Sequence, residues 1–391
     1  MSTNYSAAID TSDIKLAFAD EVTWGTAPAV AFDQMRITGE SLSEQKQRNR
    51  PQEIKPDGVV SHAITTQVGV EGAVNFALSA GTFDKFIAGA LNSTWGADSA
   101  VSDATGDLAI TLANTITSSA INFTSELVPG QWFYMNGWDT PGNNGWFRAV
   151  TVSANTLTVF PATLTAEVST GDTITINSSR IVNGTTFNSH FIEKQLASNL
   201  FLKYAGCYVS QLQLSASVGN FVEGSFNVMA KSELKGTTTS STGAYNAAPT
   251  GRVIDTVAGV ANVIVDGSAI SAPAQALQLN ITKQGARSQY AIGSADAQGM
   301  GRGTIDLSGS LTLYFKDFTM YDLYKNETDV NVSFVLKDNA GRGYGITIPA
   351  ATLMNPSIVA GGPDSDVMAE FQLEGNPDAN GRIIMIDRFV V

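Results

Sequence analysis

The sequence contains few of the residues from which metal and redox sites are built. Its 391 residues include one cysteine, Cys207, and two histidines, His62 and His190. A lone cysteine cannot form an internal disulfide, and the two histidines are too far apart in the chain to form a metal-ligand motif. We therefore expect no disulfide, no metal site and no cofactor.

Charged residues are also scarce, and basic ones are the scarcer kind. They make up 15% of the chain, with 23 Lys and Arg against 36 Asp and Glu, which gives a formal net charge of −13. Proteins bind phosphates through Lys and Arg, which release counterions from the nucleic acid. The composition therefore argues against a surface that holds nucleic acid, although nucleic acid can pass nearby.

Long apolar runs are absent too. No run approaches the roughly 18 residues that a membrane span needs, and the first residues lack the basic and apolar regions of a signal peptide. We expect synthesis in the cytoplasm and no membrane insertion. Hydrophobic residues nevertheless make up 43% of the chain, enough for a sizeable core.

The dominant hydrophobic period is two. Apolar residues alternate with small or polar ones in segments such as 108–112, 211–217, 277–281 and 304–308, and many of the 36 glycines fall between such segments. This pattern is typical of half-buried strands joined by turns. The sequence predicts an all-β fold with minor helix. Its Ser-, Thr-, Asn- and Gln-rich strand faces would suit either a wet channel or ordinary solvent.

One strand-and-helix pattern occurs twice. Residues 68–87 and 305–324 match when Gly72 is aligned with Gly309, and in both the apolar period changes from two to that of a helix. This shared change predicts a duplicated β-sandwich or barrel with short helices packed on it. The expected helix faces are Phe83, Phe86 and Ile87 in the first copy and Met320, Leu323 and Tyr324 in the second.

Three further details belong to this repeat. We expect Thr82 to cap the first helix and Asp317 the second. A shorter third match begins at Val222, without a helix, and for it chance remains an open alternative.

Residues 98–178 differ from their surroundings by dense turn signals and three of the five tryptophans, Trp132, Trp138 and Trp146. We expect a small inserted β-barrel or sandwich. The predicted division is 1–97 and 179–391 for the two parts of the main domain and 98–178 for the insert. The tryptophans would form either a core cluster or a sugar-binding platform.

Two segments are not expected to lie in a sheet. Residues 236–250 are of low complexity and predict a surface loop. Residues 40–66 form a long segment of balanced charge with two prolines, and loops of this length usually have a function. The candidate contact residues in it are Lys46, Arg48, Arg50, Glu53 and Lys55.

No set of residues forms a catalytic pattern. His190 lies in an alternating segment, as a sheet residue would, and no G-x-S-x-G motif is present. The glycine-rich segments 299–303 and 341–345 precede strands rather than helices, so they predict hairpin turns and not phosphate-binding loops. The sequence predicts a protein that is not an enzyme.

Several short motifs resemble the tail tube (major tail) proteins of bacteriophages with long, non-contractile tails. Residues 14–28, IKLAFADEVTWGTAP, are similar to the opening strand and turn of that family. The likeness continues through Arg36–Leu42, the polar segment, the strand and helix of 69–91, the segments 180–185 and 191–194, and 346–349.

The resemblance implies a structural virion protein of the phage tail, made in the host bacterial cytoplasm. Its subunits would form hexameric rings that stack head to tail into a tube and share one inner β-barrel. The implied partners are other copies of the chain, a tape-measure protein, and tail terminator and tail-tip proteins. DNA would pass through the lumen without specific binding. In this picture the 40–66 segment would contact the neighbouring ring, and the insert would project outward.

Two other functions remain open at this stage. One is a particle-displayed or secreted binding module that recognises carbohydrate through the tryptophan-rich insert. The other is a capsid decoration protein, which would form trimers on an icosahedral lattice.

Overall fold

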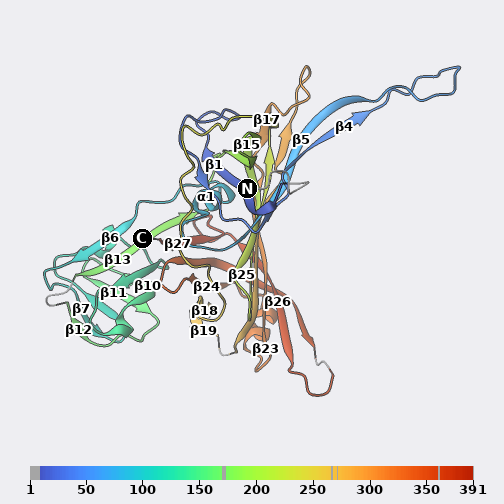
Figure 1. The fold of residues 1–391 in the computed structure, drawn as a ribbon. Helices are drawn as coiled ribbons and strands as arrows, with labels where there is room; N and C mark the ends of the chain where they lie inside the picture. Colours follow the sequence, from blue (N-terminus) through green and yellow to red (C-terminus); the bar gives the residue numbers. More distant parts are fainter. Residues whose placement is uncertain (1–8, 170–172, 266, 271, 360–361, 391) are drawn as a thin grey trace.

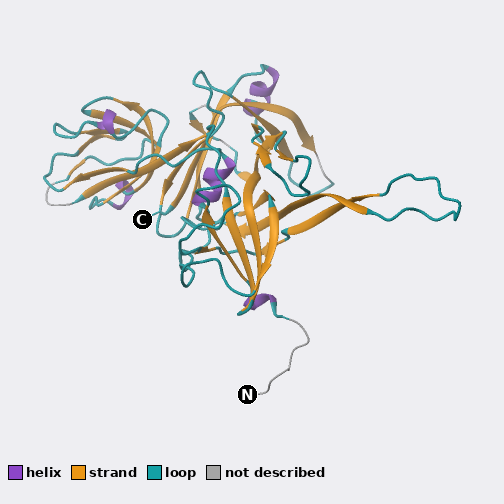
Figure 2. Cartoon of the chain, turned by 90° about the horizontal axis from the view of Figure 1, so that it is seen from above, coloured by secondary structure: helices purple, strands orange, loops and turns teal. Residues whose placement is uncertain are grey.

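The computed structural model describes residues 9–169, 173–265, 267–270, 272–359 and 362–390. Antiparallel β-strands make up most of these residues, and their two α-helices are short, α1 (Asp84–Ala90) and α2 (Thr319–Lys325). The prediction of an all-β fold with minor helix is confirmed (Figures 1 and 2).

Eight strands form a continuous antiparallel wall through the molecule. Their order across the wall is β4-β5-β16-β15-β20-β23-β26-β25. Their bounds are β4 Ser43–Asn49, β5 Ile64–Ala77, β15 Leu200–Ser217, β16 Glu223–Ala230, β20 Ala274–Gln284, β23 Thr304–Tyr314, β25 Gly343–Val359 and β26 Met368–Asn376.

The long strands β15 and β25 each continue beyond the wall into a second layer. There β15 pairs with β14 (His190–Ala197) and β17 (Ser232–Gly236), and β25 pairs with β24 (Val330–Lys337) and β27 (Met385–Phe389). The outer strands of this layer are β1 (Lys15–Asp20), beside β14, and β18 (Val260–Val265), beside β24. The main core lies between the two layers. Short strands complete the sheets: β2 Asp33–Gln34, β3 Gly39–Glu40, β19 Ser268–Ala269, β21 Arg287–Gln289 and β22 Gly299–Gly301.

The chain consists of two equivalent units, as the sequence repeat predicts. The first unit comprises β1, β4, β5, α1, β14, β15 and β16, and the second comprises β18, β20, β23, α2, β24, β25 and β26. Every pairing inside the first unit has its counterpart in the second. Even the register shift between His190 and Ile192 recurs between Val330 and Val332.

Gly72 and Gly309 occupy equivalent places in the two units. A Cβ at Gly72 would lie 2.6 Å from the Leu42 backbone, and one at Gly309 would lie 2.5 Å from the Gln278 carbonyl oxygen. Both positions therefore need glycine, because a side chain would push the neighbouring strand away. The third match, at Val222, corresponds to β16, which pairs directly with β5.

The helix ends differ in detail from the prediction. Phe83 and Phe318 occupy the two N-cap positions, and the Thr82 hydroxyl is hydrogen-bonded to Ser79 instead of to the helix. The Asp317 carboxylate does accept a hydrogen bond from the Thr319 N–H. Equivalent residues of the two helices are therefore 235 positions apart in the chain (Asp84 and Thr319), two fewer than the 237 that separate Gly72 from Gly309 in the strands.

The two helices differ sharply in burial. Six of the seven residues of α1 are buried, and Phe86 stacks on His190 with ring centroids 4.7 Å apart. In α2 no residue is buried. The same element is thus enclosed by the chain in the first unit and only partly covered in the second, where Met320, Leu323 and Tyr324 are partly buried against the main core.

The strands between residues 99 and 178 pair with one another and surround a core of their own. They continue into the main sheets through β13, which pairs with β6 and β9 at one end and with β27 at the other, so the proposed boundary at 178 falls inside a strand. The domain division stays a prediction.

The strands of this region have the following bounds: β6 Ser99–Asp103, β7 Ala109–Leu112, β8 Thr115–Thr117, β9 Trp132–Asn136, β10 Gly145–Val152, β11 Thr156–Phe160, β12 Glu167–Val168 and β13 Ile174–Val182.

The segment 40–66 is not the loop that the sequence predicts. Residues Ser43–Asn49 form strand β4, which pairs with the outer half of β5 to make a hairpin that projects from the body (Figure 1). The sequence of β4 lacks the alternation of apolar and polar residues because both faces of the strand contact solvent. We call residues 43–66 the arm. In Figure 2 the arm and the insert extend to opposite sides of the molecule.

The segment 236–250 contains no strand after Gly236, as predicted. It is tied to the body through the buried Glu193 carboxylate, which accepts hydrogen bonds from the Ser240 N–H at 2.7 Å and the Tyr245 hydroxyl at 2.6 Å.

Candidate functional site: the polar face of the wall

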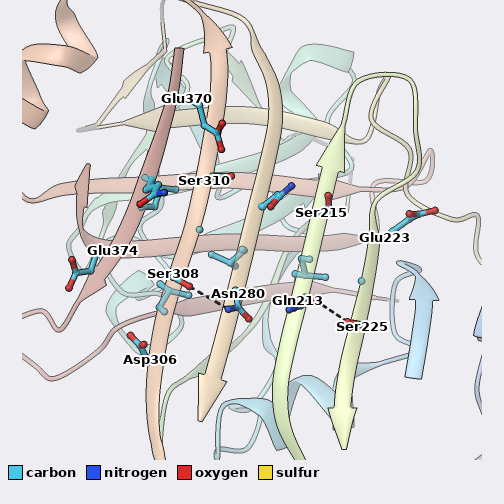
Figure 3. Close-up of a pocket in the computed structure, with 18 of the residues that line it drawn as sticks. Gln213, Ser215, Glu223, Ser225, Asn280, Asp306, Ser308, Ser310, Glu370 and Glu374 are labelled. Atoms are coloured by element: carbon cyan, nitrogen blue, oxygen red, sulfur yellow. Dashed lines mark hydrogen bonds between the residues drawn. The ribbon is translucent and has the colours of Figure 1, made fainter. Parts of the chain in front are cut away.

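One face of the eight-stranded wall is polar and concave. Along each strand the side chains alternate between the core and this face, so that Leu212, Leu279 and Leu307 are buried while their neighbours are not. The hollow measures about 1120 Å³ (Figure 3). Its polar lining residues include Asn75, Gln213, Ser215, Ser225, Gln278, Asn280, Ser308, Ser310 and Gln372.

Amide side chains form a hydrogen-bonded row across this face. Asn227 on β16 donates to Gln211 on β15, and the Gln211 amide donates to the Asn280 oxygen on β20 at 2.6 Å. The Asn280 amide in turn donates to the Ser308 hydroxyl on β23 at 3.4 Å (Figure 3). This row crosses from the first unit to the second and ties the two together.

The charge on the face is of one sign. Four carboxylates line the hollow, Glu223, Asp306, Glu370 and Glu374, and its described lining contains no Lys or Arg (Figure 3). Sequence analysis did not single out these residues. Each occupies the polar phase of an alternating strand, which is the signal that would have found them. Because carboxylates repel phosphates, the face disfavours adhesion of a nucleic acid.

The five contact residues predicted in the arm lie along its length but already have partners in the chain. Lys46 pairs with Glu44 at 3.1 Å, and Lys55 pairs with Glu53 at 3.6 Å. Arg48 donates to the Ala63 carbonyl at 2.8 Å and Arg50 to the Ser61 carbonyl at 3.3 Å. The two arginines connect the two sides of the hairpin, whereas each lysine pairs within its own side. A contact with another subunit remains a prediction.

The tip of the arm is apolar, which the charge pattern did not predict. Ile54 is fully exposed, and Val59 and Val60 are each more than half exposed. Exposed apolar side chains at the end of a long hairpin are typical of a contact surface.

The insert tryptophans are buried. Trp132 and Trp146 pack with Ile264 and Val335, at the contact between the insert and the second unit, and Trp138 belongs to the core of the insert. Their rings therefore do not form an exposed platform for a sugar.

The described residues contain no metal-binding cluster. No group of three or more His, Cys, Asp or Glu side chains in them could hold a metal ion. Burial raises the pKa of the Cys207 thiol, so the thiol is not activated. Gly341, with φ of 82°, lies in the hairpin connection between β24 and β25, as predicted. The other prediction is wrong in part, because Gly299–Gly301 form strand β22 and Gly303, with φ of 73°, lies between β22 and β23. Neither helix of the described chain has the length and hydrophobicity to cross a bilayer.

The fold is thus a duplicated antiparallel wall with an acidic polar face and a projecting arm. The family model described as phage tail tube protein matches residues 11–375. The chain therefore belongs to the phage tail tube family, a structural family of the virion tail whose members assemble into the tube. No curated protein matches the chain.

Proposed function

We propose that the chain forms rings that stack into the phage tail tube and that its polar face lines the channel through which DNA enters the host. The acidic polar face, lined by residues from seven of the eight strands, carries this proposal. A lumen of this kind keeps water at its wall and repels the DNA backbone, so the DNA slides without binding.

The arm contributes the contact between successive rings. Its charged residues Arg48, Arg50, Glu53 and Lys55 lie close to Ile54 in the sequence. The hairpin that carries them projects beyond the body (Figure 1). A head-to-tail contact repeats indefinitely along a tube, because each copy presents both complementary surfaces.

The remaining partners follow from this role. Within the tube the chain would surround a tape-measure protein, and at the two ends it would meet tail terminator and tail-tip proteins. The insert, on the side of the molecule away from the arm, would project outward (Figure 2). Synthesis in the bacterial cytoplasm precedes assembly. The hexamer expected from the resemblance, with six copies of the chain in each ring, stays a prediction.

Negative-stain electron microscopy of the purified protein, fresh and after concentration, tests this function. We expect hollow rings and stacked tubes. Uniform small particles at every concentration, also in the presence of tail-tip complexes as initiators, would contradict the proposal. If those particles bound glycans on an array, the carbohydrate-binding alternative would replace it.

A further inference from the structure

The wall has two open edges in the described chain. The last part of β25, Leu353–Val359, pairs with β26 on one side, while its pairing with β24 on the other side ends at Ala351. At the opposite end of the wall, β4 pairs only with β5. Ile358 and Val359 are exposed on the first of these edges. Open edges of this kind are binding surfaces for another strand.

The chain already contains one example of how such edges join. Strand β15, the last of the first unit, pairs with β20, the first of the second unit, with Leu214 opposite Leu279 and Gln213 opposite Asn280. The equivalent of β15 in the second unit is β25, and the equivalent of β20 in the first unit is β4 with the residues before it. These two strands, β25 and β4, are the strands at the open edges of the wall.

We propose that β25 of one copy pairs with the residues 41–45 of the next copy, in the register that β15 and β20 display. The inference rests on the proposed function, since it describes how a tube ring closes. Leu214 and Ile358 occupy the same position, opposite Gly224 and Ala369 respectively. On the other edge Asn280 and Ser43 lie opposite the equivalent residues Ser308 and Glu71. The register places Ile358 against Leu42 and Ser357 against Ser43.

A second contact supports the same arrangement independently. The buried Lys283 ammonium on β20 donates to the Gly89 carbonyl, at the end of α1, at 2.6 Å and to the Asn92 side chain at 2.7 Å. The residue equivalent to Lys283 is Lys46, since they oppose the equivalent residues Ile305 and Val68. Lys46 is largely exposed.

The acceptor side of this contact is also repeated. Glu327 follows α2 as Asn92 follows α1: their φ angles are 48° and 50°, and their N–H groups bond to the equivalent carbonyls of Tyr324 and Gly89. In the proposed ring, Lys46 of one copy therefore meets the Tyr324 carbonyl and the Glu327 carboxylate of the next. The copy that contributes Lys46 would cover α2 of the next copy, as the second unit covers α1 within one chain. In this arrangement Lys46 belongs to the contact between copies within a ring.

Disulfide trapping tests the seam. Gln213 and Asn280 both face the polar hollow, so cysteines at the equivalent positions, Ser357→Cys and Ser43→Cys in one chain, should lie within bonding distance across the seam. After oxidation of assembled tubes, a denaturing gel without reductant should show a ladder of cross-linked chains. Cys207 is fully buried and stays out of the reaction.

Matched variants make the result specific. Each single cysteine should give no ladder, and Ser357→Cys with Gln47→Cys, about 13 Å out of register, should give little. Tubes that form without cross-links would overturn the seam but leave the tube function intact. A chain that stays monomeric under all conditions would overturn both the function and the seam.

Charge exchange tests the Lys46 contact. Lys46→Glu and Glu327→Lys should each weaken ring formation about tenfold, and the double variant should restore it. Repulsion between the carboxylate introduced at position 46 and the nearby Glu44 would not be relieved by a change at position 327. Lys55→Glu combined with Glu327→Lys serves as the control and should not restore assembly. A failure of the double variant to recover would overturn this contact.

Discussion

The Lys283 ammonium of the second unit lies 2.6 Å from the carbonyl oxygen of Gly89 in the first. It is almost fully buried, it lies 3.8 Å from the centre of the Tyr208 ring, and its hydrogen-bond partners are neutral. Burial, and secondarily the charge of Arg302, lower the pKa of Lys283 to about 6. The junction between the two units is therefore sensitive to protonation.

This junction predicts a pH dependence of stability. In an unfolded chain the pKa of a lysine is about 10.4, so between pH 6 and 10 unfolding takes up a proton at Lys283. The free energy of unfolding should rise with pH in this range, by at most ~1.4 kcal/mol per pH unit from this group. Below pH 6 both states are charged and the contribution to the slope vanishes.

Urea unfolding of the unassembled protein between pH 6.5 and 8 measures this slope. Lys283→Met should reduce it, because the titrating group is gone. Lys46→Met removes the equivalent but exposed lysine and should leave the slope as in the wild type. Equal slopes in all three proteins would show that Lys283 keeps its charge when folded.

The acidic face predicts an effect on DNA passage. Glu370→Lys with Glu374→Lys changes two neighbouring carboxylates of the hollow into cations. Tubes should still form, because both side chains lie off the core, but DNA should be released from particles about tenfold more slowly, as lysines bind phosphates. The loss should diminish at high salt.

A control with the same change of charge lies outside the hollow. Asp364→Lys with Asp366→Lys alters the turn between β25 and β26, whose residues do not line the hollow. Release at the wild-type rate from these particles, together with slow release from the first variant, would assign the lumen to the polar face. Equal rates in both would place the lumen elsewhere.

The arm tip gives a further prediction. Ile54→Asp with Val59→Asp places charges on side chains that contact solvent in the single chain, so the melting temperature of the monomer should stay within about 2 °C of the wild type. Stacking of rings into tubes should be lost, since the apolar contact would need to bury two carboxylates. Rings without tubes in electron micrographs are the expected result.

Reversal of the charges beside the tip separates the two parts of the arm. Arg48→Glu with Arg50→Glu removes hydrogen bonds to the Ala63 and Ser61 carbonyls and should weaken polymerisation without unfolding the body. Normal tubes from this variant would assign ring contact to the apolar tip alone.

Local patterns predicted much of this fold. The alternation in β15, β20 and β23 and the change of period after Gly72 and Gly309 are properties of short segments, and the strands and helices formed where these patterns occur. The arm was missed for the converse reason. The strand SEQKQRN faces solvent on both sides, so it lacks the alternation by which a half-buried strand is recognised.

The candidate site depends on neighbours that no local pattern reveals. Glu223 and Glu370 are more than a hundred residues apart and reach one face only because β16, β15, β20, β23 and β26 adjoin in that order. The spacing of the repeat is two residues shorter for the helices than for the strands. This difference likewise arises in the turns that precede the helices. The proposed seam at Ile358 likewise depends on the pairing of β15 with β20, two strands whose contact no local pattern predicts.

One buried ion pair joins β13, which leads out of the insert, to β27. Asp387 on β27 is fully buried, accepts two hydrogen bonds from the Arg180 guanidinium at 2.7 and 2.9 Å, and accepts a third from the Trp132 N–H at 2.9 Å. Asp387→Ala would leave the guanidinium without its carboxylate, which costs about 3–5 kcal/mol in comparable pairs. We expect this loss in the free energy of unfolding, with earlier proteolysis between the insert and β27.

Arg382→Ala serves as the control, because it breaks a pair at the surface and should cost less than about 1 kcal/mol. Similar losses in the two variants would mean that the insert is held by the apolar contact of Trp132 and Trp146 instead.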